Sequence, residues 1–268
     1  MTDAPGTFDE RTHRPLWIDL DGAANVRDVG GLPARGGRTR PGVLLRADAL
    51  DALSPADVTE LAVRRGLRHV VDLRTPGERA ERGRGLLGAQ PGVRHSELPV
   101  IDDEQLEARR LARAERLAAG EATAAIMADG YAQLLDWGAQ AFVTAMQAAL
   151  DDDGVPVLVH CSAGKDRTGV LVALLLGAAG VEPAAIVADY AATASRMAGV
   201  VERLRTSEQF AGAMDALPGF TFDAEASTMQ RLLALLDAGW GGPAGWLSAQ
   251  GVADTELARW RELLIEPA

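Results

Sequence analysis

Residues 156–169 read PVLVHCSAGKDRTG, and this stretch decides the fold and the function expected of the chain. Its first part, residues 156–160, is an apolar run of strand length, typical of a central strand covered on both faces of a sheet. After the polar loop, the run VLVALLL at residues 170–176 predicts a buried helix. A strand, a loop and a buried helix in direct succession indicate an α/β protein.

The loop holds the only cysteine of the chain, Cys161, and the only lysine, Lys165. One cysteine cannot form an internal disulfide, which suits a reducing compartment and excludes structural bridging as its purpose. Every other cation of fixed charge is arginine. A lysine retained at this position therefore suggests that a compact ammonium is needed there.

The residues after Cys161 are suited to hold a phosphate. A concave loop over residues 162–166 would point its backbone N–H groups inward, toward the positive end of the following helix. That cradle would bind a phosphate dianion and favour the thiolate of Cys161, which makes the sulfur a nucleophile at neutral pH. Arg167 can bind two phosphoryl oxygens in bidentate fashion, and better in the transition state than in the ground state. We expect the phosphate to be bound by Ser162, Ala163, Gly164, Lys165, Asp166 and Arg167.

Two flanking residues have predicted supporting roles. We expect His160 to orient the loop through its imidazole. Thr168 can donate its hydroxyl to the sulfur and help the thiolate depart when water cleaves a phosphocysteine intermediate.

The segment HCSAGKDRTG resembles the signature loop of protein tyrosine phosphatases. Its GKDRT form is similar to the bacterial tyrosine-phosphatase-like family, which is also related to dual-specificity and lipid phosphatases. Further segments resemble that family's recurring motifs in the same order, namely residues 25–32, 45–50, 71–74, 188–193 and 241–264. The resemblance implies a central, mostly parallel sheet flanked by helices, with a helical elaboration or lid.

Phosphatases of this kind need a general acid for the leaving oxygen. The Trp-Pro-Asp tripeptide that often marks this acid is absent from the sequence. The resemblance implies that Asp166, within the loop, can serve as acid and base. Asp72 is the second candidate because strand ends face the ligand crevice in α/β sheets, but it can equally be a turn residue paired with Arg74. More remote alternatives are Asp102, Asp103 and Asp129.

A tyrosine leaving group has a pKa of about 10 and needs less help from an acid than an alkoxide does. We therefore expect hydrolysis of phosphotyrosine in a phosphorylated protein or peptide. Lys165 adds positive field, and the resemblance to lipid-phosphatase loops implies dual-specificity or phosphoinositide hydrolysis as the alternative. A catalytically inert phosphate-binding module is the alternative of another class.

Composition excludes several other functions. The net charge of -11 offers no basic surface to nucleic acid, and no apolar run is long enough for an integral membrane segment. The first twenty residues do not read as a signal peptide, so we expect a cytoplasmic protein, with export by another route left open. We expect neither cofactor nor metal, since His13, His69, His95 and His160 do not form a ligand cluster by spacing.

We expect a flexible tail at residues 1–15 and one phosphatase domain over residues 16–268, with a possible lid within 195–222. Helix starts are predicted at Ser54 and Thr75, each followed by proline. The other local predictions are strands over 43–45, 69–73 and 93–98, a loop over 33–42, an exposed helix or flap over 102–122, a helix over 123–150 broken near residue 138, and helices over 184–192, 195–210, 224–238 and 255–264.

Overall fold

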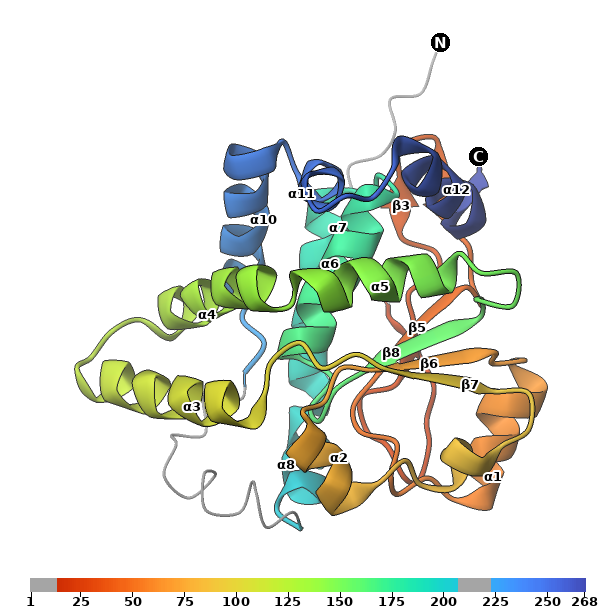
Figure 1. Cartoon of the computed structure of the whole chain (residues 1–268), viewed down its shortest axis with the longest axis horizontal. Coiled ribbons are helices and arrows are strands. Elements are labelled where there is room, and N and C mark those ends of the chain that lie inside the picture. Colours follow the sequence, from red (N-terminus) through yellow and green to blue (C-terminus); the bar gives the residue numbers. More distant parts are fainter. Residues whose placement is uncertain (1–13, 207–222) are drawn as a thin grey trace.

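The computed structural model describes residues 14–206 and 223–268. Its centre is a six-stranded sheet with the order β1-β2-β5-β8-β6-β7, in which the last four strands are parallel. The strands are β1 (Leu16–Trp17), β2 (Arg27–Asp28), β5 (Leu44–Ala47), β8 (Val157–His160), β6 (His69–Asp72) and β7 (Arg94–Glu97). Helices flank this sheet (Figure 1), so the predicted α/β fold is confirmed.

Strand β8 lies inside the sheet, between β5 and β6, and all four of its residues are buried. The register places His160 opposite Ala47 of β5 and Asp72 of β6. The carboxyl end of β8 therefore lies in the middle of one sheet edge, where open parallel sheets bind their ligands. The predicted phosphate loop begins at this point.

Side chains alternate between two apolar clusters on opposite faces of the sheet. Val157 and Val159 belong to the larger cluster, and Leu158 to the smaller one. The larger cluster includes residues of α4 (Thr123–Trp137), α5 (Ala139–Ala149), α6 (Asp166–Ala178), α7 (Pro183–Ala192), α10 (Ala226–Trp240), α11 (Pro243–Ala249) and α12 (Asp254–Leu264). The smaller includes residues of α1 (Pro55–Val58), the π-helical turn η1 (Thr59–Arg64) and the 3-10 turn η2 (Leu86–Ala89).

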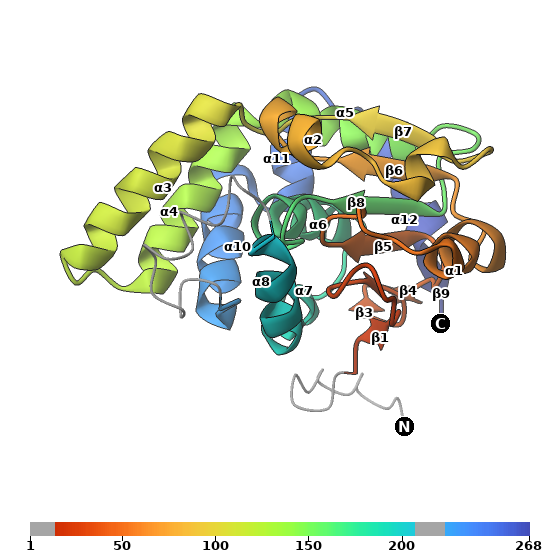
Figure 2. The same cartoon turned by 90° about the horizontal axis from the view of Figure 1, so that it is seen from below.

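Four shorter or more exposed elements lie near the carboxyl end of β8, as Figure 2 shows for α2, α3 and α8. They are α2 (Pro76–Arg82), α3 (Asp103–Ala118), the 3-10 turn η3 (Thr193–Arg196) and α8 (Met197–Leu204). Helix α3 contains no buried residue, which agrees with the exposed helix predicted for this part of the chain.

The local signals for helix ends were informative. Ser54 and Thr75 cap α1 and α2, and each forms a capping box with the residue three positions later, Asp57 or Glu78. The helix predicted over residues 123–150 is divided into α4 and α5 at Gly138. Part of the helix predicted over 195–210 is present as α8, and residues 207–222 lie outside the described part of the chain.

The loop predicted over residues 33–42 is wrong. Strands β3 (Pro33–Ala34) and β4 (Gly37–Thr39) form a hairpin, and β4 also pairs with β9 (Ile265–Pro267). A Cβ at Gly37 would lie 2.0 Å from the carbonyl oxygen of Glu266, so the glycine permits close pairing with the C-terminal strand. The composition that suggested a loop therefore serves a small three-stranded sheet.

No helix within residues 14–206 or 223–268 combines the length and apolar character needed to cross a membrane.

Candidate active site

The loop after β8 carries Cys161, which is buried with 2 % of its surface exposed. Gly164 turns the loop with a φ of 66°, and a Cβ at this position would lie 2.4 Å from the carbonyl oxygen of Ala47. The amide of Ala49 also donates to the carbonyl oxygen of Ser162 over 3.1 Å. The loop is thus pressed against the end of β5 before α6 begins at Asp166.

Arg167 is fixed by a buried glutamate on α2. Its Nη1 lies 2.5 Å from Oε2 of Glu78, and its Nη2 lies 2.8 Å from Oε1. Glu78 also accepts hydrogen bonds from Ser162 Oγ (2.6 Å) and the amide of Thr75 (2.8 Å). Burial alone would raise the pKa of Glu78, but the charge and hydrogen bonds of Arg167 outweigh it and lower the pKa to about 2. The guanidinium therefore has a permanent counter-charge on one edge.

Sequence reasoning missed Glu78. Its signal is the segment TPGE, in which glutamate occupies the third helical position after the cap Thr75. The Glu78 carboxylate closes the capping box of α2 and also binds Arg167.

A second buried network lies behind the loop. Arg46 Nη2 donates to the carbonyl oxygen of Gly164 over 2.8 Å, and Asn25 Nδ2 donates to the carbonyl oxygens of Ala163 (3.2 Å) and Gly164 (3.3 Å). In a trans peptide the C=O and the next N–H point in opposite directions. The N–H groups of Gly164 and Lys165 therefore point away from these two donors, as a concave phosphate loop requires.

Asp189 of α7 joins the two arginines of this network. Its carboxylate lies 2.8 Å from Arg27 Nε and 2.6 Å from Arg46 Nη1, and Arg27 Nη2 also donates to Thr193 Oγ1 over 3.0 Å. Burial raises the pKa of Asp189, but the two arginines outweigh this effect and lower it to about 2. Three of the sequence motifs, residues 25–32, 45–50 and 188–193, thus meet behind the loop.

Asp166, the first candidate for the acid, receives a hydrogen bond from Tyr131 Oη over 2.6 Å. Tyr131 and Tyr190 are also joined through their hydroxyls at 2.7 Å, and both rings are buried. Lys165 Nζ lies 3.7 Å from Asp166 Oδ1. Burial raises the pKa of Asp166, but Lys165, Arg113 and the hydrogen bond from Tyr131 lower it overall. The carboxylate is 31 % exposed and lines the cavity beside Cys161.

Asp72, the second candidate, is not among the residues that line the cavity with Cys161. Its Oδ2 lies 2.7 Å from Arg74 Nη2 and 3.8 Å from His160 Nε2. Burial raises the pKa of Asp72, but the His160 and Arg74 charges lower it overall. These contacts favour the interpretation in which Asp72 is a turn residue paired with Arg74.

The three remote candidates for the general acid have structural partners. Asp102 caps α3, Asp103 accepts hydrogen bonds from Thr75 Oγ1 and the amide of Gly77, and Asp129 pairs with Arg116.

The two predicted supporting residues flank the loop. Nδ1 of His160 lies 3.2 Å from the carbonyl oxygen of Cys161, and burial lowers the pKa of this imidazole. Thr168 Oγ1 is buried and has no hydrogen-bond partner in the described chain, so its expected bond to the sulfur is not formed in this structure. A buried hydroxyl without a partner is unusual and leaves Thr168 free to donate during a reaction.

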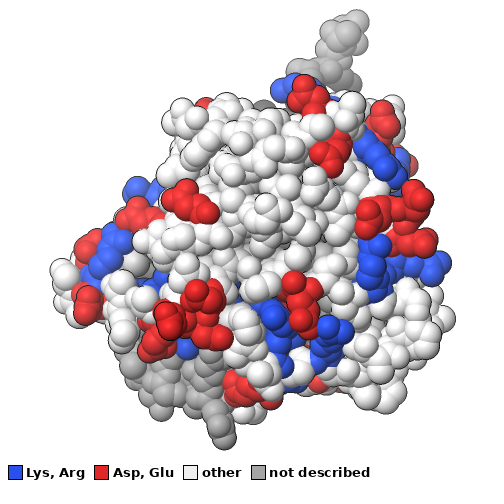
Figure 3. Space-filling view, viewed as in Figure 1, with Lys and Arg blue, Asp and Glu red and all other residues white. Residues whose placement is uncertain are grey.

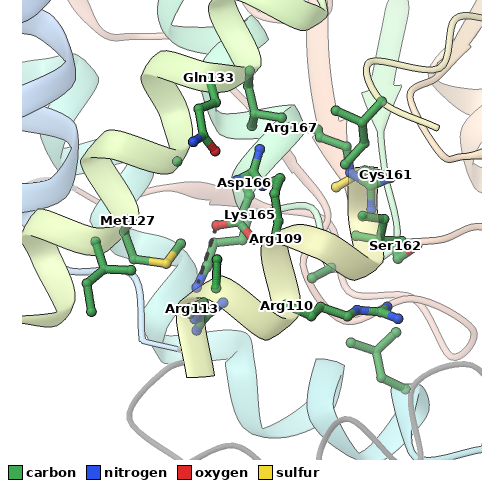
Figure 4. A pocket seen from close by; sticks show the side chains of 18 of the residues that line it. Arg109, Arg110, Arg113, Met127, Gln133, Cys161, Ser162, Lys165, Asp166 and Arg167 are labelled. Carbon is green, nitrogen blue, oxygen red and sulfur yellow. Dashed lines mark ion pairs between the residues drawn. The ribbon is translucent and has the colours of Figure 1, made fainter. Parts of the chain in front are cut away.

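Cys161, Asp166 and Arg167 line a cavity of about 180 Å³. Its walls come from the loop, α3, α4 and α8, and Figure 4 shows the residues gathered around it. In the portions of the chain that the structure describes, no group of three or more His, Cys, Asp or Glu side chains is placed to hold a metal ion.

A cysteine at the end of a central parallel strand, close to an arginine at the start of a helix, has the setting of a nucleophilic cysteine. The comparison with known proteins is more specific, because the tyrosine phosphatase family model matches residues 18–266. The chain belongs to this family, and the predicted family and enzyme class are confirmed.

Three relatives illustrate the match. The chain is 31 % identical to a predicted tyrosine-protein phosphatase of Cupriavidus necator, over 86 % of this chain and 82 % of that protein. It is 32 % identical to a tyrosine-protein phosphatase of Nostoc commune, over 80 % and 71 %. It is 29 % identical to the triple specificity protein phosphatase PtpB of Mycobacterium tuberculosis, over 92 % and 98 %.

Proposed function

We propose that the chain hydrolyses phosphotyrosine through a phosphocysteine intermediate, with Cys161 as the nucleophile and Arg167 binding the phosphoryl group. The pairing of Arg167 with Glu78 is the observation that carries this proposal. A guanidinium has five N–H donors, and Glu78 occupies one on each Nη. The Nε–H and the second Nη2–H remain on the adjacent edge, where they can bind two phosphoryl oxygens together.

The reaction takes two displacements. The thiolate of Cys161 attacks phosphorus, the bond to the tyrosine oxygen breaks, and Asp166 gives that oxygen a proton. A water molecule then attacks the phosphocysteine, Asp166 takes its proton, and the P–S bond breaks to release phosphate and the thiolate. Arrival of a phosphate dianion raises the proton affinity of the neighbouring Asp166, which prepares it to act as the acid.

Turnover of para-nitrophenyl phosphate tests the proposal. We expect the intact protein to release para-nitrophenol and Cys161→Ser to abolish release while retaining phosphate binding. Binding without turnover by the intact protein would instead support the inert phosphate-binding module.

The identity of the acid can be tested through the leaving group. Asp166→Asn should reduce turnover of phosphoserine peptides, whose leaving group is a poor one, far more than turnover of para-nitrophenyl phosphate. Asp72→Asn should reduce both to the same extent, because it removes the partner of Arg74 and leaves the acid in place. The reverse pattern would assign the acid to Asp72.

The proposal also covers the range of substrates. We propose phosphorylated proteins or peptides as the main substrates, with dual-specificity or phosphoinositide hydrolysis as the alternative and no role for nucleic acid. Lys165, which is buried at the cavity, and the triple specificity of the Mycobacterium relative support the alternative. Relative kcat/KM values on phosphopeptides and phosphoinositides decide between them.

We further propose one catalytic domain over residues 16–268, because a single apolar cluster has members from Val29 to Ile265. A cytoplasmic location would keep the nucleophilic thiol reduced. Of the lid expected within residues 195–222, we propose the described part, residues 195–206, because Met197 and Leu204 line the cavity. Hydrogen exchange of this segment with and without an active-site anion tests the lid. Activity that survives a chelator tests the expectation that no metal is required.

A further inference from the structure

The cavity beside Cys161 has a charge opposite to that of the whole chain. The sequence contains 38 acidic and 27 basic residues of fixed charge, yet among the described residues that line the cavity only Asp166 is acidic. The basic lining residues are Arg109, Arg110, Arg113, Arg116, Lys165 and Arg167. By contrast, acidic and basic residues are interspersed on the face shown in Figure 3.

Most of this positive charge comes from α3, across the cavity from the phosphate loop (Figure 4). Arg109, Arg113 and Arg116 follow the i, i+4, i+7 spacing of one helix face. Because α3 has no buried residue, this face contributes little to the apolar core. Arg116 is held at the far end by Glu121 (2.7 Å) and Asp129 (2.8 Å).

On this face, the surroundings of Arg109 are the best suited to bind an anion. A Cβ at Gly130 of α4 would lie 3.0 Å from Arg109 Nη2, so the glycine leaves space for the guanidinium. Glycine inside a helix is less stable than alanine by about 1 kcal/mol, so the space for the guanidinium is obtained at the expense of helix stability. Nη1 of Arg109 is buried and has no hydrogen-bond partner in the described chain. A buried charged donor without a partner is likewise unfavourable, and a bound anion would satisfy it.

The position of Arg109 relative to the reaction site also fits a bound anion. Burial lowers the pKa of Arg109. The Asp166 carboxylate raises this pKa, and the positive charge of Arg167 lowers it further. Arg109 thus lies within electrostatic reach of both reaction-site residues. The loop and Arg167 already supply donors for one phosphate dianion, so the α3 charge is additional to what that phosphate needs.

We propose that Arg109, with Arg113 beside it, forms a second anion subsite for phosphotyrosine peptides that carry another anionic group next to the phosphotyrosine. The proposal rests on the proposed phosphatase function and specifies its substrate class. A guanidinium binds a carboxylate or a second phosphoryl group in the same bidentate manner. The net charge of -11 disfavours approach to an extended anionic membrane surface more than approach of a short peptide with a few charges, so a peptide fits better than a lipid headgroup.

Relative kcat/KM values test the subsite. The substrates are a phosphotyrosine peptide flanked by glutamate, the same peptide flanked by alanine, and a version with a neighbouring phosphoserine. The intact enzyme should prefer both anionic peptides over the alanine peptide by roughly tenfold or more, as expected for one charge-assisted hydrogen-bonded pair. Arg109→Gln should remove most of this preference, and Arg109→Lys should retain part of it. Arg64→Gln, a control at a side chain that is 73 % exposed on η1, should leave the preference unchanged.

Binding of the same peptides to Cys161→Ser gives a readout that does not need chemistry. The anionic peptides should bind more tightly, and addition of Arg109→Gln should remove the difference. The subsite would be overturned if the intact protein showed no preference for the anionic peptides. It would also be overturned if Arg109→Gln lowered kcat/KM equally for all three peptides. A preference for a soluble inositol bisphosphate over the monophosphate that depends on Arg109, without a peptide preference, would overturn it in favour of a lipid headgroup. Failure to hydrolyse para-nitrophenyl phosphate would refute the proposed function alone.

Discussion

Arg167 and Glu78 form a buried two-point ion pair, with Nη1 to Oε2 and Nη2 to Oε1 distances of 2.5 and 2.8 Å. Because this pair fixes the edge of the guanidinium that faces phosphate, Glu78→Gln should lower kcat/KM for para-nitrophenyl phosphate. Loss of one charge-assisted contact predicts a fall of roughly ten- to a hundredfold. Glu60→Gln, at a partly exposed glutamate on η1 that pairs with Arg64, is the control and should retain activity. Full activity of Glu78→Gln would contradict a positioning role.

Much of the fold could be predicted because its signals are local. The strand around β8, the capped starts of α1 and α2, and the break at Gly138 each depend on a few consecutive residues. The β3–β4 hairpin was missed because its Gly- and Pro-rich composition is typical of a loop, and the pairing of β4 with β9 was missed because β9 lies at the other end of the chain. No pattern within residues 33–42 can indicate that partner.

The same distinction applies to the site. Cys161, Asp166 and Arg167 lie within one contiguous segment of seven residues, so their spacing alone suggested a common site. Glu78 comes from α2 and Tyr131 from α4, and their contacts with the loop depend on how these helices pack. The ring of Tyr131 is buried in the helix packing, but its hydroxyl donates to Asp166, a contact that helical spacing does not indicate.

The two tyrosines of the chain form a hydrogen-bonded series that ends at Asp166. Tyr131→Phe removes a donor that stabilises the Asp166 carboxylate, so the pKa of Asp166 should rise. The pH optimum of kcat/KM for an aryl phosphate should then move to higher pH, because more of the free enzyme keeps its acid protonated. Tyr190→Phe leaves the bond from Tyr131 to Asp166 in place and should move the optimum less. An unchanged optimum in Tyr131→Phe would argue against Asp166 as the acid.

The bend at Gly164 gives a steric prediction. Gly164→Ala should abolish most activity, since the new Cβ would meet the backbone of Ala47 and the φ of 66° is unfavourable for alanine. Gly239→Ala is the matched control, because a Cβ added at this helical glycine would have no atom within 4 Å and the residue has no positive φ. That substitution should leave turnover unchanged and raise stability by about 0.5 to 1 kcal/mol. Thermal unfolding and phosphatase assays on both variants check the pair, and an active Gly164→Ala enzyme would show that the loop tolerates a different bend.

The buried carboxylates predict how stability responds to acid. The pKa values of Asp189 and Glu78 are lowered from 3.8 and 4.5 to about 2 in the folded chain. A group with a lowered folded pKa contributes its full stability above its unfolded value and loses it as the pH falls through the folded value. The free energy of unfolding should therefore decrease between about pH 4.5 and pH 2.

Asp189→Asn separates the contribution of that residue. It leaves Arg27 and Arg46 buried without their shared counter-charge, which should cost about 3 to 5 kcal/mol at neutral pH. It should also flatten the stability profile below pH 3.8, because one of the carboxylates that take up protons there is gone. Denaturant unfolding from pH 7 to pH 2 measures both effects, with Asp237→Asn as the control at an exposed aspartate. If Asp189→Asn followed the same acid profile as the unmodified chain, the ion-paired network behind the phosphate loop would not be a source of this stability.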